Sequence, residues 1–445
     1  MRIPALITGF SIALGSAIAL TPSFSLALVA LLFLFTIRKW QYILVIGVAS
    51  LLCFVRQPPP PATYSGTGTF KVHSAKPHEL PFRNALVVRG TFDGHPCSIF
   101  FPKGAKPPLD GSYRVQGRLN GTIFRPAKKT TWEKIPYTYS LAGFRYRTKQ
   151  KIYAHLTHYI QPKETADFLS AIITGDIENR FVKFHFSRLG LQHILAISGL
   201  HFGIIALLLG FILRRLLPST KATLTLLTIL TAYAILLGDT PSVMRAYLMI
   251  TVYLAGTLLG RKTTPLNAVG VALCIELLYD PTHITHIGCL LSYSATLAIL
   301  LFTRPVENLL TLLLPKRSAI ELEQMPLFDK HGYALLQPLR KALSLNFSVF
   351  LLTSPIILST FGNLPLLSLL YNLFYPFLIT GSIALLLLGL HPINAWYTTY
   401  ILDIVRYAPP SWRLTLHFDH FHPDLALLLV TLPFLYLTKQ QLQIK

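Results

Sequence analysis

Apolar runs long enough to cross a membrane recur along this chain, with short polar segments between them. Three come first, at roughly 4–20, 25–36 and 41–55, of which the second is short for a full span and either tilts little or forms a hairpin with the third. Eight more lie near 189–213, 222–238, 241–260, 264–279, 284–303, 344–361, 364–390 and 423–438. A helix that crosses the bilayer core needs about 20 apolar residues. The pattern therefore predicts a polytopic α-helical membrane protein. A hydrophobic content of 52% and a mean hydropathy of +0.51 exclude a soluble globule of this length.

Basic clusters between the apolar runs predict the topology. Lys and Arg pairs stand at 38–39, 214–215, 261–262, 316–317 and 340–341. Cytoplasmic loops are enriched in these residues, and alternation of the spans brings all five pairs to one side. We therefore expect residue 1 inside and the segment after 55 outside. Because no small-residue cleavage site follows the first run, it is expected to be a retained span.

Between 57 and 163 the pattern changes to short alternating runs. These runs are 67–73, 85–90, 98–101, 113–119 and 122–125, and turn dipeptides such as Asp93-Gly94 and Asn120-Gly121 separate them. Five short strands so close together predict a small all-β barrel of the OB type. The expected domains are N-terminal transmembrane segments at 1–56, a basic OB-like extracytoplasmic domain at 57–163, and a transmembrane channel domain at 164–445.

The formal net charge of +22 is concentrated in the expected outer domain. Residues 56–163 hold 18 Lys and Arg but only four Asp and Glu. The cytoplasmic bias cannot explain charge on that side, so a polyanion ligand is indicated, DNA first. Aromatic residues interleave with the cations, which suits single strands, although a barrel core would also use them. The predicted DNA-binding residues are Arg83, Arg89, Arg114, Arg118, Arg125, Lys128, Lys129 and Trp132.

Polar residues interrupt the apolar run that starts near 190. His193, Ser198 and His201 lie there, and Gly199 and Gly203 form a small-xxx-small pair that permits close helix contact. Polar groups at membrane depth are costly unless they face protein or water. They either bond to neighbouring backbone or line a hydrated path, with the helix unwound at Ser198-Gly199. The predicted lining residues are His193, Ser198, Gly199, His201, Gly203, Ser242, Arg245, Asn267, Ser292 and Asn372.

Two features of these polar segments have alternative interpretations. Arg245 either snorkels to the outer headgroups or meets phosphates at a pore entrance. The donors of 417–422 suggest a metal site, but an interfacial loop is the favoured interpretation. A triad of Asp176, Ser198 and His201 has no support in its spacing, and it would need Ser198 and His201 in bonding contact. No catalytic residue, metal or cofactor is predicted, and no enzymatic activity.

Several segments resemble the ComEC/Rec2 competence family in order and spacing across 164–390. They are Ile173-Thr174-Gly175-Asp176, the stretch 193–203, Pro241-Ser242-Val243-Met244-Arg245-Ala246, Asn267-Ala268-Val269-Gly270 leading to Asp280-Pro281, Gly288-Cys289-Leu290-Leu291-Ser292, and Ser354-Pro355 with Asn372. The resemblance implies a multi-pass bacterial inner-membrane channel for single-stranded DNA in natural transformation. Region 65–135 is similar to the family's OB-like domain. Many members carry a C-terminal metallo-β-lactamase-like domain, which this sequence is expected to lack because no His-x-His-x-Asp-His signature occurs.

The expected partners follow from this function. They are single-stranded DNA, the lipid bilayer, DNA-receptor proteins and a separate ATPase motor, because the chain holds no P-loop. A homo-oligomer is left open. The alternative function is a secondary transporter for a small anionic solute, which inverted repeats would favour, and none is evident in the sequence.

Overall fold

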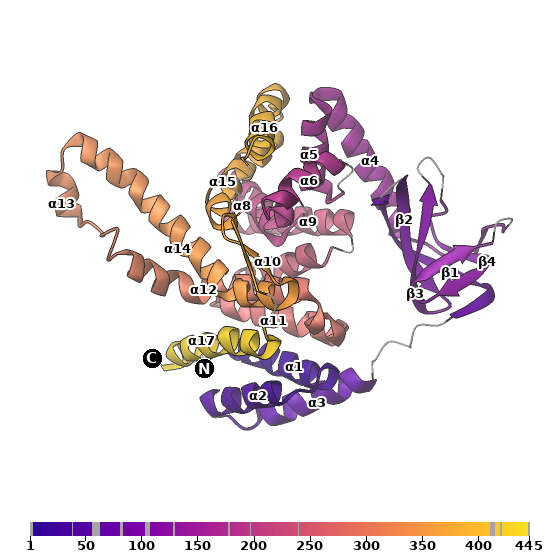
Figure 1. Cartoon of the computed structure of the whole chain (residues 1–445). Coiled ribbons are helices and arrows are strands. Elements are labelled where there is room, and N and C mark those ends of the chain that lie inside the picture. Colours follow the sequence, from indigo (N-terminus) through magenta and orange to yellow (C-terminus); the bar gives the residue numbers. More distant parts are fainter. Residues whose placement is uncertain are drawn as a thin grey trace. The chain divides into compact units, whose positions relative to one another are not determined.

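The fold is known from a computed structural model of the chain. It describes residues 3–37, 39–55, 63–80, 83–102, 107–127, 130–176, 179–195, 197–238, 240–409, 414–418 and 421–443. Helices predominate, and the structure also contains one larger β-sheet (Figure 1). Contacts divide the chain into two compact units. The first unit holds 1–57, 248–378 and 410–445, and the second holds 58–247 and 379–409.

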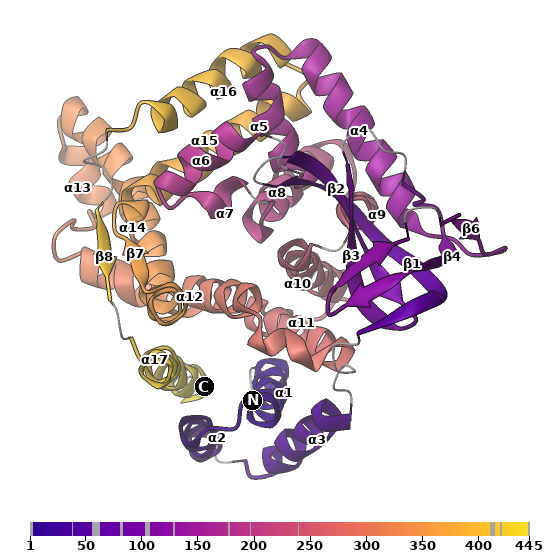
Figure 2. The same ribbon diagram turned by 45° about the vertical axis from the view of Figure 1, so that its right-hand side comes forward.

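The first unit is helical apart from one short β-ribbon. Its elements are α1 (Pro4–Leu20), α2 (Phe24–Ile37), α3 (Tyr42–Val55), the end of α10 (Pro241–Leu258), α11 (Pro265–Tyr279), η1 (Pro281–Thr285), α12 (Ile287–Leu310), α13 (Ala319–Gln324), α14 (Leu327–Phe361), the start of α15 (Ser368–Leu387) and α17 (Pro423–Gln443). Strands β7 (Asn363–Pro365) and β8 (Thr415–His417) pair antiparallel. Helices α1, α2, α3 and α17 lie side by side in both views (Figures 1 and 2).

Glycines let α1 approach two other helices at backbone distance. A Cβ built on Gly270 of α11 would lie 2.2 Å from the backbone nitrogen of Leu6, and one on Gly9 would lie 2.7 Å from the Gly270 carbonyl oxygen. A Cβ on Gly15 would lie 2.3 Å from the carbonyl oxygen of Ile46 in α3. Small residues at crossings are how helices pack tightly in lipid, where apolar burial supplies little drive. The two contacts fix α1 between α11 and α3.

The second unit combines a barrel with helices. Its elements are β1 (Thr63–Leu80), β2 (Arg83–Phe92), β3 (His95–Pro102), β4 (Ser112–Asn120), β5 (Ile123–Pro126), β6 (Glu133–Lys134), α4 (Leu141–Tyr159), α5 (Lys163–Thr174), α6 (Arg180–Arg188), α7 (Gln192–Leu195), α8 (Gly199–Leu216), α9 (Ser219–Leu237), the start of α10, the end of α15 and α16 (His391–Arg406). The strand order is β1-β2-β3-β5-β4, and β4 pairs back with β1. A closed five-stranded barrel results, which confirms the predicted OB-like domain.

Strict alternation in the strands builds the barrel core. Along β4 every second side chain is buried, as a strand with one inward face requires. Phe70, Phe92 and Phe124 are fully enclosed, and the Phe92 and Phe124 ring centroids are 4.2 Å apart. The aromatic residues of the region therefore serve mainly as core.

The helices that follow the barrel differ from the expected pattern. The 19-residue helix α4 was not predicted, because it carries cations and little apolar periodicity. Helix α5 is buried over most of its length. Helix α4 packs against one part of α5 and α16 against another, so both faces are covered.

Five helices are long and apolar enough to cross a bilayer within the part of the chain that the structure describes. They are α8, α9, α12, α14 and α15, while α1, α2, α3, α11 and the start of α17 are shorter apolar helices. The predicted spans are thus confirmed as helices, with two corrections. The span expected at 189–213 is interrupted before Gly199, and α14 begins 17 residues before the expected 344. With 35 residues, α14 is about 52 Å long, whereas the bilayer core measures about 30 Å.

The crossing of α1 and α11 provides a test of the first unit. We expect Gly270→Leu to destabilise the protein by more than the ~1–3 kcal/mol usual for overpacking, because the new side chain meets rigid backbone. Thermal unfolding of the detergent-solubilised chain measures the effect. Gly47→Leu in α3 is the matched control, since a Cβ there meets no atom of the described residues within 4 Å. Equal melting of the two variants would contradict the packing argument.

Candidate functional site

An exposed row of arginines runs along one face of the barrel. Arg114 and Arg118 alternate with buried residues of β4 and point outward. Arg125 of β5 stands directly opposite Arg118 in the antiparallel register and is also exposed. Like charges directly opposite one another repel and destabilise a sheet. A bound anion between Arg118 and Arg125 would remove this repulsion. We call Arg114, Arg118 and Arg125 the arginine row.

The other predicted DNA-binding residues are placed less uniformly. Arg89 is exposed on β2. Trp132 is half-buried and packs against the barrel core, with its ring centroid 6.0 Å from those of Phe70 and Tyr113. The ring therefore packs against the barrel core on one side, and its role in DNA binding stays a prediction. Lys128 and Lys129, and the side chain of Arg83, lie outside the described residues.

Three cations of α4 are committed to contacts within the protein. The Arg145 Nε donates to the carbonyl oxygen of Ile235 at 2.7 Å. The Arg147 guanidinium donates to both Asp110 oxygens, at 3.2 and 3.0 Å, which raises its pKa. Lys149 is buried and pairs with Asp176 at 3.2 Å. The charge surplus of 57–163 is thus smaller on the surface than its count suggested.

The Lys149–Asp176 pair joins α4 to the turn after α5, outside the candidate spans. Burial raises the pKa of the Asp176 carboxyl, and the nearby Lys149 and Lys76 oppose that rise. Gly175 adopts a positive φ of 75° in the same turn, and a Cβ there would lie 2.6 Å from Ile197 Cγ2. The turn therefore packs directly against the residue that precedes Ser198. The Lys149–Asp176 pair therefore holds the turn that packs against Ile197, just before the N-cap of α8.

The polar groups of Ser198 and His201 cap the N-terminus of α8. The Ser198 backbone N–H donates to His201 Nδ1 at 3.2 Å, and the His201 N–H donates to Ser198 Oγ at 3.5 Å. This reciprocal capping box satisfies two donors at the helix end. The structure contains an element of each alternative left by the sequence. The helix is interrupted just before Gly199, and local hydrogen bonds satisfy the polar groups of Ser198 and His201.

Helices α8 and α10 meet at the same point. The Gly199 N–H donates to Ser242 Oγ at 3.1 Å, and a Cβ at 199 would come within 3.3 Å of the Ser242 carbonyl oxygen. Gly199 thus permits close contact as predicted. Gly203 does not, since a Cβ built there meets no heavy atom of the described residues within 4 Å, and this half of the small-xxx-small prediction is corrected.

Arg245 lies one turn beyond Ser242 on α10 and is only 3% exposed. A side chain that snorkelled to the headgroups would reach the surface of the protein. The enclosure of Arg245 by protein therefore argues against the snorkelling interpretation. His193 belongs to α7, and its side chain is outside the described residues.

The remaining predicted lining residues, Asn267, Ser292 and Asn372, belong to the first unit. Asn267 Oδ1 accepts from the Ala5 N–H at 3.3 Å, so this side chain serves the start of α1. Ser292 and Asn372 are half-buried on α12 and α15. Nearby, Glu276 accepts from the Tyr293 hydroxyl at 2.9 Å and lies 3.3 Å from His283 Nδ1. Glu276, an acidic group in an apolar helix, thus has polar partners, as expected because an unpaired charge at membrane depth is costly.

The structure gives little support to hydrolytic chemistry. Ser198 Oγ and His201 Nδ1 are 3.2 Å apart, which meets the distance condition. However, Nδ1 already accepts the Ser198 N–H, His201 is 1% exposed, and Asp176 pairs with Lys149. A base that is closed to water and occupied by a cap cannot activate the hydroxyl for a substrate.

Across the described ranges, no three His, Cys, Asp or Glu side chains gather as a metal site.

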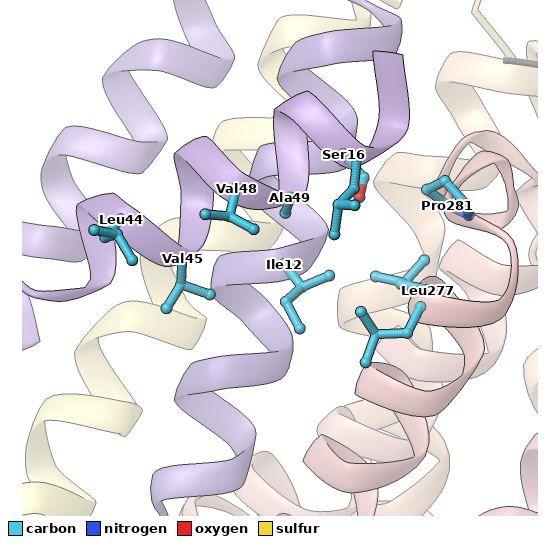
Figure 3. A pocket seen from close by; sticks show the side chains of 10 residues that line it. Ile12, Ser16, Leu44, Val45, Val48, Ala49, Leu277 and Pro281 are labelled. Carbon is cyan, nitrogen blue, oxygen red and sulfur yellow. The ribbon is translucent and has the colours of Figure 1, made fainter. Parts of the chain in front are cut away.

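A cavity of about 200 Å³ opens in the first unit between α1, α3, α11 and η1 (Figure 3). Its lining includes Ile12, Leu44, Val48 and Leu277, and Ser16 is the polar side chain among them. Such a lining suits hydrocarbon and offers no partner to a phosphate. The cavity is therefore no candidate for the polyanion site.

The buried Lys149–Asp176 pair was not predicted from the sequence. Substituting each partner tests whether the two side chains stabilise the protein together. We expect Lys149→Met to destabilise the protein by about 3–5 kcal/mol, because a buried carboxylate loses its counter-charge. The double variant Lys149→Met/Asp176→Leu should recover most of this loss. Thermal unfolding of both variants and of Asp176→Leu completes the double-mutant cycle. Additive losses would show that the two groups do not interact.

Comparison with known proteins shows to which family the chain belongs. The competence protein family matches residues 178–438. ComE operon protein 3 of Bacillus subtilis (strain 168) is 25% identical over 328 residues, which cover 64% of this chain and 41% of that protein. The chain therefore spans less than half the length of this relative. No solved structure matches. Because the family match covers more than half of its length, the chain belongs to the competence protein (ComEC/Rec2) family.

Proposed function

We propose that this protein carries single-stranded DNA across the bacterial inner membrane during natural transformation. The observation that carries the proposal is the arginine row, in which Arg118 and Arg125 face each other on the outer surface of the barrel. Such a pair favours a bound anion, and a row of cations along a strand matches a polymer of phosphates. Membership of the competence family supports DNA as that polymer.

The proposed path has two stages. The barrel gathers the strand by charge, and the helices of the membrane domain then let it pass with water. The interrupted helix at Ser198-Gly199 supports this second stage, since non-helical backbone at membrane depth is tolerated only inside protein or beside water. Arg245 on the adjoining helix is a cation enclosed by protein, so its field and not direct contact would attract phosphates that pass nearby.

The proposal describes a conduit and not an enzyme, so energy comes from elsewhere. A separate ATPase motor on the cytoplasmic side and DNA-receptor proteins on the outer side are its proposed partners. A homo-oligomer remains compatible with it.

Salt dependence tests the binding stage. The full chain in neutral-lipid nanodiscs should bind a single-stranded oligonucleotide with an affinity that falls steeply as salt rises. Replacing Arg114, Arg118 and Arg125 with Ala should lower the slope of log affinity against log salt by about 2, at roughly 0.7 per phosphate contact. The control variant replaces the exposed Arg214, Arg215 and Arg261 with Ala. Affinity that ignores salt, or equal slopes for both variants, would argue against the arginine row.

Transformation assays test the conduction stage. Deletion of the gene should leave DNA uptake to the periplasm intact and abolish entry to the cytoplasm. Arg245→Gln should reduce entry at least roughly tenfold, as for about 1.4 kcal/mol in barrier height, while Arg245→Lys retains more. Labelled DNA and transformant counts measure the two steps, with membrane abundance of each variant determined in parallel. Normal entry in Arg245→Gln cells would remove Arg245 from the path.

A further inference from the structure

Two tyrosines stand out on the barrel because their rings face solvent. Tyr137 is 94% exposed and Tyr139 is 86% exposed, in the segment between β6 and α4. Most other aromatic rings of this region, including Phe92 and Phe124, are packed in the core. Exposed rings of this size are a cost in water unless they meet a partner.

The segment that carries the two tyrosines is fastened to the barrel. Between them, Thr138 Oγ1 donates to the Ile135 carbonyl at 2.7 Å and accepts from the Ser112 N–H at 3.0 Å. After them, Ser140 Oγ donates to the Val72 carbonyl at 2.8 Å. Gly111 allows this approach, because a Cβ there would lie 2.8 Å from the Thr138 carbonyl oxygen. Thr138 therefore points toward β4 while both rings point away.

The backbone of Tyr137 is held in a left-handed conformation, with φ of 59°. This region is unfavourable for a bulky side chain, and such residues persist where surrounding contacts impose them. The exposed position of Tyr137 therefore carries a cost in backbone conformational energy. A ring fixed in this way loses little freedom when a ligand binds against it.

Exposed cations surround the two rings. Lys134 precedes them on β6, Arg114 begins the arginine row, and Lys71 stands opposite Ser112, whose amide holds Thr138. The acidic groups nearby are largely matched, since Glu133 faces Arg114 across the β4–β6 pair and Asp110 binds Arg147. Rings and cations thus lie together at the end of the barrel where the arginine row starts.

We propose that Tyr137 and Tyr139 form a base-stacking site for single-stranded nucleic acid at the start of the arginine row. The site rests on the proposed function and sharpens it. Aromatic rings beside cations bind single strands by stacking the bases while the charges neutralise the phosphates. A duplex keeps its base faces inside its own stack, so the two tyrosines make the surface selective for a strand that is already separated.

The test uses the full chain in nanodiscs of phosphatidylcholine. Tyr137→Leu/Tyr139→Leu should bind an oligothymidylate at least roughly tenfold more weakly, since stacking contributes about 1–3 kcal/mol per base. Its salt slope and its affinity for inorganic polyphosphate should be unchanged, because leucine removes no cation. Tyr137→Phe/Tyr139→Phe should bind the oligonucleotide normally. Tyr279→Leu is the matched control, as Tyr279 is 84% exposed at the end of α11.

The outcomes separate this inference from the function on which it rests. If the unaltered chain does not bind the oligonucleotide, the proposed function fails. If it binds and the leucine variant binds equally well, the stacking site fails and the arginine row stands.

A membrane-interface role for the rings is the competing explanation. It is tested by Tyr139→Trp, whose added fluorescence should be quenched by the oligonucleotide. Quenching by brominated lipid instead would overturn the proposal.

Discussion

Helix ends are the constraint on which the rest of this protein depends. The last carbonyl groups of a helix lack partners within it, and in a membrane domain water does not readily supply them. Arginine side chains supply donors at two such ends, Arg145 to Ile235 of α9 and Arg188 to Val405 and Arg406 of α16 and to Ala408 after it. Arg340 likewise donates to the Leu314 and Pro315 carbonyls in the loop after α12. Each contact joins segments remote in sequence. The cations therefore organise the helices as well as carrying charge.

This use of arginine and lysine divides the net charge of +22 into two classes. Cations of the first class are fixed, as Lys149 is by Asp176 and Arg406 by Glu164. Cations of the second class, such as Arg118 and Arg125, face solvent on the barrel with a like charge opposite. Cations of this second class are placed to bind anions. The interpretation of the protein as a DNA carrier depends on that small set and not on the total charge.

Much of the fold follows from patterns that a linear sequence preserves. Alternation predicted the five barrel strands, because inward and outward positions must alternate in β4 as in any half-buried strand, although β1 extends well beyond the expected 67–73. Apolar length predicted the spans for a similar reason. Helix α4 escaped prediction, since it is held by contacts with β1, α5 and α9 rather than by an apolar stripe of its own. The packing of Trp132 against the core could not be predicted for the same reason.

The sequence by itself determined which segments form apolar helices, which form the barrel, and where cations and glycines gather. Only the tertiary structure decided what individual polar residues do. Ser198 and His201 cap a helix, Gly199 binds Ser242 43 residues away, and Arg245 is enclosed by protein. The physical reason is that periodicity records a residue's preference for lipid or water. Its hydrogen-bond partner depends on which distant segment packs against it, and local pattern carries no record of that choice.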